Sequence, residues 1–201
     1  MLVYSFYILD SAVHIIFFSN LGQTKRYIFS GEFDNILIRP LAPLFFFMLL
    51  SFNEYAMGQI CLGFLLMAYA LKALSIKITI GAIILIIYFI LAAALILGAF
   101  TIISVTFLFF TEGTFSPLSA VVSLQEFAKY PLTIFNRYIK AIFTWIMPLG
   151  FVSFYPASYF FKNYQTGFPV LLVSFFIVVS FFCLAVLFFN YGIRKYQSTG
   201  G

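Results

Sequence analysis

The hydrophobic and polar positions divide the chain into long apolar runs separated by short polar interruptions. Runs near or above the length needed to cross a bilayer as a helix occupy residues 2–19, 55–73, 78–111 and 168–191. They are continuous in Leu, Ile, Phe and Ala, whereas the strands of a transmembrane barrel alternate apolar and polar residues. The pattern therefore predicts membrane-spanning α-helices.

The longest of these runs is 78–111, with no charged residue between Lys77 and Glu112. As one helix it would reach about 50 Å, well beyond a hydrocarbon core of about 30 Å. No turn chemistry suggests two short spans and a hairpin, so we favour one long helix. Such a helix can tilt, project from the bilayer or break near Gly98.

The stretch from 118 to 167 is irregular and offers no clean span of 20 residues. Broken apolar helices are tolerated at membrane depth only where protein covers them or where they line a cavity. We therefore expect one broken crossing within 118–160 together with a re-entrant or interfacial helical hairpin. The residues that mark this re-entrant region are Tyr130, Pro131, Pro148 and Pro156.

A short mixed-charge segment, residues 30–40, lies between the first two runs. Its apolar and polar residues each recur at helical spacing, which predicts an amphipathic helix over about 31–39. Arg39 precedes Pro40 and so ends the helix. We interpret it as a surface helix whose apolar side lies on lipid and whose polar side faces a soluble partner. The apolar positions are Phe29, Phe33, Ile36 and Leu37, and the polar ones are Glu32, Asn35 and Arg39.

The first run contains two ionisable residues, Asp10 and His14, four positions apart on one helix face. Ionisable groups inside a membrane are costly and usually face the bundle interior or water. One interpretation is a contact for protons or substrate. The other is a mutually satisfied pair near the interface.

Composition agrees with the helical pattern. The chain is 64% hydrophobic and 8% charged, against about 25% charged in soluble domains. Its net charge of +5 reports topology rather than nucleic-acid binding, because no Lys/Arg cluster could follow a phosphate backbone. Bases within 20–43 and at Arg194 and Lys195 favour the cytoplasmic side for both segments, although Lys72 and Lys77 then fall in an external loop.

We therefore predict an all-α fold: a polytopic membrane helical bundle with about five transmembrane helices, forming a single domain over residues 1–201. We expect Cys61 and Cys183 to be free, buried thiols, because they lack the spacing and partners of a disulfide or metal site. The chain has no P-loop, no serine elbow and a single His, so we expect no catalytic residues, metal or cofactor of its own.

Three function classes are consistent with these features. The first is a transport permease that takes its energy from a partner. The second is a membrane-embedded transferase that uses Asp10 and His14 as a catalytic pair. The third is a gradient-driven carrier or channel, which would favour inverted repeats that this sequence does not show.

Three ordered blocks carry a resemblance to a known family. Residues Gly31-Glu32-Phe33-Asp34-Asn35-Ile36-Leu37-Ile38-Arg39-Pro40-Leu41 resemble the G-x-x-D-x-x-L-x-R-P stretch of bacterial ABC-2 family permeases. The second block comprises Tyr130-Pro131-Leu132-Thr133-Ile134-Phe135, Pro148-Leu149-Gly150-Phe151 and Tyr155-Pro156-Ala157. The third, Gly192-Ile193-Arg194-Lys195-Tyr196-Gln197-Ser198-Thr199-Gly200, is similar to the closing L-R-R-Y-x-S-x-G of that family.

The resemblance implies an exporter-type permease subunit in the bacterial cytoplasmic (inner) membrane. Such subunits form homodimers or heterodimers and dock on a cytoplasmic ATPase subunit that binds ATP and Mg. The family's coupling helix, which touches the ATPase, falls here on Glu32, Phe33, Asp34, Asn35 and Arg39. The broken region 130–160 would supply re-entrant helices near the outer mouth of the pathway. Family members carry a further span before the position of Met1, so the resemblance implies a chain that starts at the second span.

Overall fold

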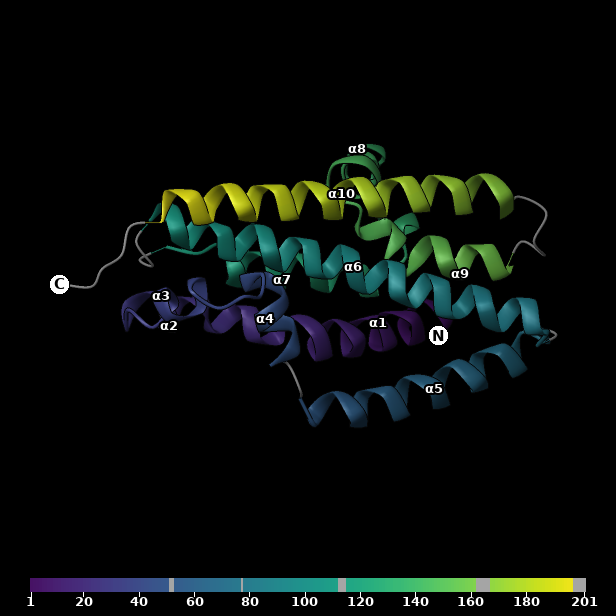
Figure 1. Ribbon diagram of the computed structural model, residues 1–201. Coiled ribbons are helices and arrows are strands. Elements are labelled where there is room, and N and C mark those ends of the chain that lie inside the picture. Colours follow the sequence, from purple (N-terminus) through teal and green to yellow (C-terminus); the bar gives the residue numbers. More distant parts are fainter. Residues whose placement is uncertain (51–52, 77, 112–114, 162–166, 197–201) are drawn as a thin grey trace.

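The computed structural model describes residues 1–50, 53–76, 78–111, 115–161 and 167–196, and the regular elements within them are helical (Figure 1). The long helices are α1 (Leu2–Phe18), α5 (Tyr55–Ala73), α6 (Ile80–Phe110) and α10 (Gly167–Lys195). The short α-helices are α2 (Thr24–Phe29), α3 (Phe33–Leu37), α4 (Pro43–Leu49), α7 (Leu118–Gln125), α8 (Arg137–Ala141) and α9 (Phe154–Phe161). Single turns are the 3₁₀ elements η1 (Ser19–Gln23), η2 (Glu126–Lys129), η3 (Leu132–Ile134) and η5 (Leu149–Phe151) and the π-helical η4 (Ile142–Ile146).

Within the described residues, four helices are long and apolar enough to cross a membrane. They comprise Leu2–Phe29, in which α1 continues through η1 into α2, and then Tyr55–Ala73, Ile80–Phe110 and Val170–Lys195. The predicted all-α, polytopic membrane bundle is therefore confirmed. The sequence suggested about five crossings, and the remaining segment, 118–161, consists of short helices and turns.

Helix α6 is the centre of the bundle, packed against α1 and α10, while α5 packs on the far side of α1 (Figure 1). Its first turn is capped by Thr79, whose hydroxyl oxygen accepts a hydrogen bond from the Ala82 N–H at 3.2 Å. The helix is continuous over 31 residues and passes through Gly98 without a break. At about 1.5 Å per residue, α6 is about 46 Å long. Because it has no break, it fits a bilayer by tilting or by projecting beyond the hydrocarbon core.

Glycines allow the long helices to approach closely. A Cβ atom built on Gly98 of α6 would lie 2.5 Å from the Phe18 ring, and one on Gly63 of α5 would lie 2.7 Å from Leu9. Small residues at helix contacts are typical of membrane bundles, where association depends on close van der Waals packing. The glycines therefore set the spacing of α1 against α5 and α6.

The broken segment runs the length of the bundle from one end of α6 to the other. Its middle packs against the middle of α6, where Ala93 and Ile96 are fully buried. Its last helix, α9, reaches the beginning of α1 and α6, since the rings of Phe160 and Phe6 have centroids 6.0 Å apart. Protein therefore covers one side of this irregular backbone, as its depth in a membrane requires.

The two ends of the bundle differ. Helices α2 and α3 and the C-terminal ends of α6 and α10 gather at one end, at the left of Figure 1. The α5–α6 turn and the start of α10 lie at the other end, and the N-terminus lies between that end and the middle of the bundle. We call these the coupling end and the distal end.

Both cysteines are free, but the prediction that they are buried is wrong. Cys61 of α5 and Cys183 of α10 are exposed on the outer surface of the bundle. Both helices are peripheral, and an apolar helix at the periphery of a membrane protein turns apolar side chains towards lipid. Hydrophobicity along the sequence could not distinguish burial in protein from burial in lipid.

Candidate coupling site

The coupling end is built around α3, which is delimited by a turn on each side. Gly31 precedes the helix with φ of +70°, in the left-handed region that favours glycine. At the other end the Arg39 N–H donates to the Ile36 carbonyl at 3.3 Å, and Pro40 then prevents continuation. The result is a five-residue helix, shorter than the predicted 31–39.

The inner side of α3 is anchored by aromatic packing. Phe33 has no exposed surface, and its ring centroid lies 5.1 Å from that of Phe109 at the end of α6. The same ring lies 5.0 Å from Tyr196, the residue that follows α10. Ile36, one turn further, is 3% exposed in the same core cluster. Both inner residues of α3 therefore pack in one cluster with the C-terminal ends of α6 and α10.

The outer side of α3 is open. Glu32, Asn35 and Arg39 are all exposed. The Arg39 guanidinium lies over the ring of Phe46 in α4, 4.6 Å from its centroid, a cation–π contact that restrains a long side chain. Ile38 is 82% exposed beside it. This surface offers both charges and an apolar side chain to a partner.

Asp34 lies between these two sides. The Asp34 side chain is half-buried. The pKa of the Tyr196 hydroxyl is raised above its ordinary value, mainly because Tyr196 is itself partly buried and secondly because the negative charge of Asp34 is near. The effect places the carboxylate close to the end of α10 rather than far out in solvent. Asp34 therefore lies between the exposed residues around α3 and the buried cluster that contains Phe33.

Two interpretations of this segment need correction. The apolar side was expected to lie on lipid, but Phe33 and Ile36 are covered by protein, while Phe29 and Leu37 are exposed. Phe33 was also expected among the residues that touch the ATPase, and a fully buried ring cannot reach a soluble partner. The physical reason is that α3 is so short that its two inner residues suffice to fix it on the bundle.

The structure does not join Asp10 to His14. His14 Nε2 lies 2.9 Å from the hydroxyl oxygen of Thr101 on α6. Asp10 is fully buried, and neither carboxylate oxygen has a hydrogen-bond partner among the described residues. The interpretation as a mutually satisfied pair is therefore not what the structure shows, and the transferase hypothesis loses the contact on which its catalytic pair depends.

The residues expected to mark the re-entrant region begin or flank the short helices of the broken segment. Pro131 precedes η3, Pro148 precedes η5, and Pro156 is the third residue of α9, where a missing N–H costs nothing. Tyr130 is exposed, and its ring lies 5.7 Å from the ammonium group of Lys129. Each proline thus sits where the backbone begins a new helical turn.

Sequence reasoning missed the two partners of Phe33. Phe109 is one of several Phe in an unbroken apolar run, and Tyr196 lies in what reads as a polar tail. Neither position carries a local signal, because the contact joins segments far apart in the chain. The aromatic residue at the centre of a charged segment is the feature that could have suggested a buried anchor.

The fold and this site together define a polytopic membrane protein in which a short surface helix is fixed to the long helices of the bundle. A family model described as ABC-2 family transporter protein matches residues 1–200. The chain therefore belongs to the ABC-2 transporter family, as the three sequence blocks indicated. No match was found among curated proteins or among solved structures. Membership makes the chain the membrane component of an ABC transporter, not itself an enzyme.

Proposed function

We propose that this permease subunit belongs to an exporter whose separate cytoplasmic ATPase docks on the outer side of α3. The observation that carries the proposal is the position of α3, whose inner residue Phe33 packs on the ends of α6 and α10 while Glu32, Asn35 and Arg39 face outward. The resemblance of the three blocks to exporter permeases supports the direction of transport. ATP and Mg bind to the partner, and the membrane is the bacterial cytoplasmic membrane.

A movement of the ATPase would reach the long helices through the packing of Phe33 against Phe109 and Tyr196. A displacement of the ATPase pushes α3, and α3 can yield only by moving Phe109 and Tyr196 with it. Helices α6 and α10 share the most extensive packing in the bundle, so they respond together. ATP binding then biases an inward against an outward arrangement of the helices, a shift between two states.

A second permease subunit completes the pathway. Helices α5 and α10 expose much of their apolar surface, including Leu65 and Phe176, at 70% and 68%. Lipid or a second subunit must cover these faces. We propose that the subunit works as a homodimer or heterodimer.

The test is a charge reversal on the outer side of α3. We expect Arg39→Glu to reduce recovery of the ATPase with the tagged chain about tenfold, the effect of about 1.4 kcal/mol at an interface. The tagged chain is isolated from membranes of its source cells, and mass spectrometry scores any protein with a P-loop. Lys72→Glu, an exposed base at the distal end, is the matched control. Absence of any P-loop protein, or equal recovery with both variants, contradicts the proposal.

A further inference from the structure

Helix α1 carries an acidic side chain, Asp10, in the interior of the bundle. Asp10 has no exposed surface, and neither of its carboxyl oxygens has a hydrogen-bond partner among the described residues. The other acids that the structure describes lie at the surface: Asp34 is half-buried at the coupling end, and the exposed ones are Glu32, Glu54 and Glu126. Within the described ranges, Asp10 is therefore the acid that the protein keeps fully away from water, and the coupling site does not use it.

The side of the bundle to which Asp10 is turned follows from the residues one turn before and after it. Phe6 lies four positions earlier, packs against Phe160 of α9 and belongs to a core cluster with the first half of α6. His14 lies four positions later, and its Nε2 is 2.9 Å from the hydroxyl oxygen of Thr101 on α6. Residues four apart share one face of a helix. Asp10 therefore lies on the face of α1 that packs against α6 and α9, between these two contacts.

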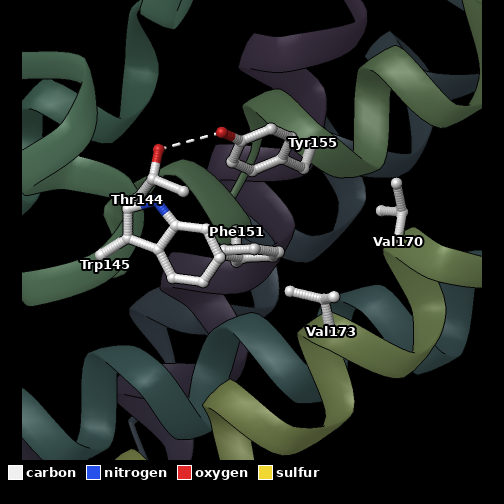
Figure 2. A pocket seen from close by; sticks show the side chains of 6 residues that line it. All are labelled: Thr144, Trp145, Phe151, Tyr155, Val170 and Val173. Atoms are coloured by element: carbon white, nitrogen blue, oxygen red, sulfur yellow. Dashed lines mark hydrogen bonds between the residues drawn. The ribbon is translucent and has the colours of Figure 1, made fainter.

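No base on the elements that pack most on α1 is placed to neutralise this carboxyl group, among the residues described. Helix α6 carries no charged residue, Lys72 of α5 is exposed, and Lys129 of η2 is bound to Glu126 at 2.7 Å. The Tyr155 hydroxyl of α9 shares a hydrogen bond of 2.9 Å with Thr144 (Figure 2). α4 and η1 have no ionisable side chain, and the others on α1, α5, α6 and α9 are Tyr4, Tyr7, Tyr55, Cys61, Tyr69, Tyr88 and Tyr159.

His14 does not donate to the buried carboxyl group either. The Thr101 hydroxyl donates to the Leu97 carbonyl at 3.2 Å, so its oxygen accepts from the Nε2–H of His14. This N–H of the imidazole is thus used at α6 and not at Asp10. The partner that removes the charge of Asp10 must therefore come from outside the side chains around it.

The ligand that fits Asp10 is a proton. An ionised carboxylate without a partner costs far more free energy in an apolar interior than the neutral carboxylic acid does. A metal cation would need several oxygen ligands. Across the part of the chain that the structure describes, no group of three His, Cys, Asp or Glu side chains could hold one. A proton needs only the carboxyl oxygen itself.

We infer that Asp10 is a proton-binding site in the interior of the bundle, and that the bound proton holds α1 against α6. Release breaks the O–H bond, passes the proton to water and leaves a carboxylate that water must solvate. The contact between these helices has no room for water, since a Cβ atom on Gly98 of α6 would already lie 2.5 Å from the Phe18 ring of α1. The two helices must therefore separate when the proton leaves. The inference is independent of the ATPase and of the direction of transport.

Infrared spectroscopy tests whether the proton is bound. The C=O stretch of a protonated carboxyl group is separate from the bands of an ionised carboxylate, and exposed acids are ionised at about pH 7. The purified full chain in a detergent without ester groups should show this stretch at neutral pH. Asp10→Asn, which keeps the shape of the side chain, should remove it, and Glu126→Gln at the surface should retain it. A missing band in the unmodified chain overturns the inference, and so does a band that survives Asp10→Asn or is lost in Glu126→Gln.

Thermal unfolding at several pH values tests what the proton does. The folded chain holds the proton more tightly than the unfolded chain, so stability is greatest at low pH and falls as the pH rises. We expect the melting temperature to fall by about 5 °C between about pH 5 and about pH 8. Asp10→Asn should flatten this curve, whereas His14→Gln should keep its slope. Parallel curves for the unmodified chain and Asp10→Asn, or a slope lost only in His14→Gln, would show that this proton does not hold α1 in place.

A third arm separates a proton from a monovalent metal cation. Replacement of sodium by choline in the buffer should leave both the infrared band and the melting temperature unchanged. A band that appears only in choline would show that sodium displaces the proton from the carboxyl group, and the proton assignment would then be wrong.

Discussion

At the scale of single residues, Phe33 determines how α3 is held on the bundle. Its ring is buried between Phe109 and Tyr196, whereas Phe29, four positions earlier, is 56% exposed. Two phenylalanines on either side of the turn between α2 and α3 thus have opposite roles. Phe33 fixes α3 to the bundle, and Phe29 is available to lipid or to a partner.

Phe33→Ala should lower the free energy of unfolding by about 3 kcal/mol or more, because it leaves a cavity beside the aromatic rings of Phe109 and Tyr196. Phe29→Ala should change it by no more than about 0.5 kcal/mol, as expected of an exposed position. Thermal unfolding of the two purified variants in the same detergent measures the difference. Equal melting temperatures would show that Phe33 is not an anchor.

At the scale of elements, the contact between α6 and α10 has to be tight if the two helices are to move together. A Cβ atom on Gly192 of α10 would lie 2.6 Å from the Thr106 side chain and 3.5 Å from its carbonyl oxygen. The main chain of α6 limits how far this contact can relax. The helices therefore meet at a position where only glycine fits without a shift.

Gly192→Ala should destabilise the bundle by about 1–3 kcal/mol, because it forces α10 away from α6. Gly58→Ala in α5 is the control, since nothing lies within 4 Å of the added Cβ and alanine favours a helix. The melting temperature should fall for the first variant and stay level or rise for the second. The contact would be looser than described if both variants behaved alike.

At the scale of the whole molecule, the two ends of the bundle belong on opposite sides of the membrane. α3 and the end of α10 lie at one end, and the α5–α6 turn lies at the other. The broken segment leads the chain back from the coupling end toward the distal end, so that α10 ends at the coupling end beside α3.

A cysteine-labelling experiment tests this orientation. In a background with Cys61→Ser and Cys183→Ser, Asn35→Cys should react with a membrane-impermeant maleimide only after the cells are opened. Ser75→Cys, in the α5–α6 turn, should react in intact cells. Both positions are exposed, so a missing signal reflects the membrane and not burial. Labelling of Asn35→Cys in intact cells would reverse the topology and remove the docking site for an ATPase.

The sequence by itself determined the class of protein and much of its outline. Long uninterrupted apolar runs permit few structures other than membrane helices, because lipid offers no partner to a backbone N–H or carbonyl. The run ahead of Glu112 accordingly forms one continuous helix, α6, and the irregular stretch after it forms broken turns. The first family block marked the segment that contains α3, including the exposed Glu32, Asn35 and Arg39.

Only the tertiary structure decided what covers each apolar face. Hydrophobicity shows that Phe33 and Cys61 avoid water, but lipid and a protein core are equally apolar, so it cannot tell which one surrounds them. The structure places Phe33 in the core and Cys61 on the outer surface. It also gives His14 a partner on α6 in place of Asp10, because hydrogen bonds follow the packing of distant helices rather than spacing along one of them.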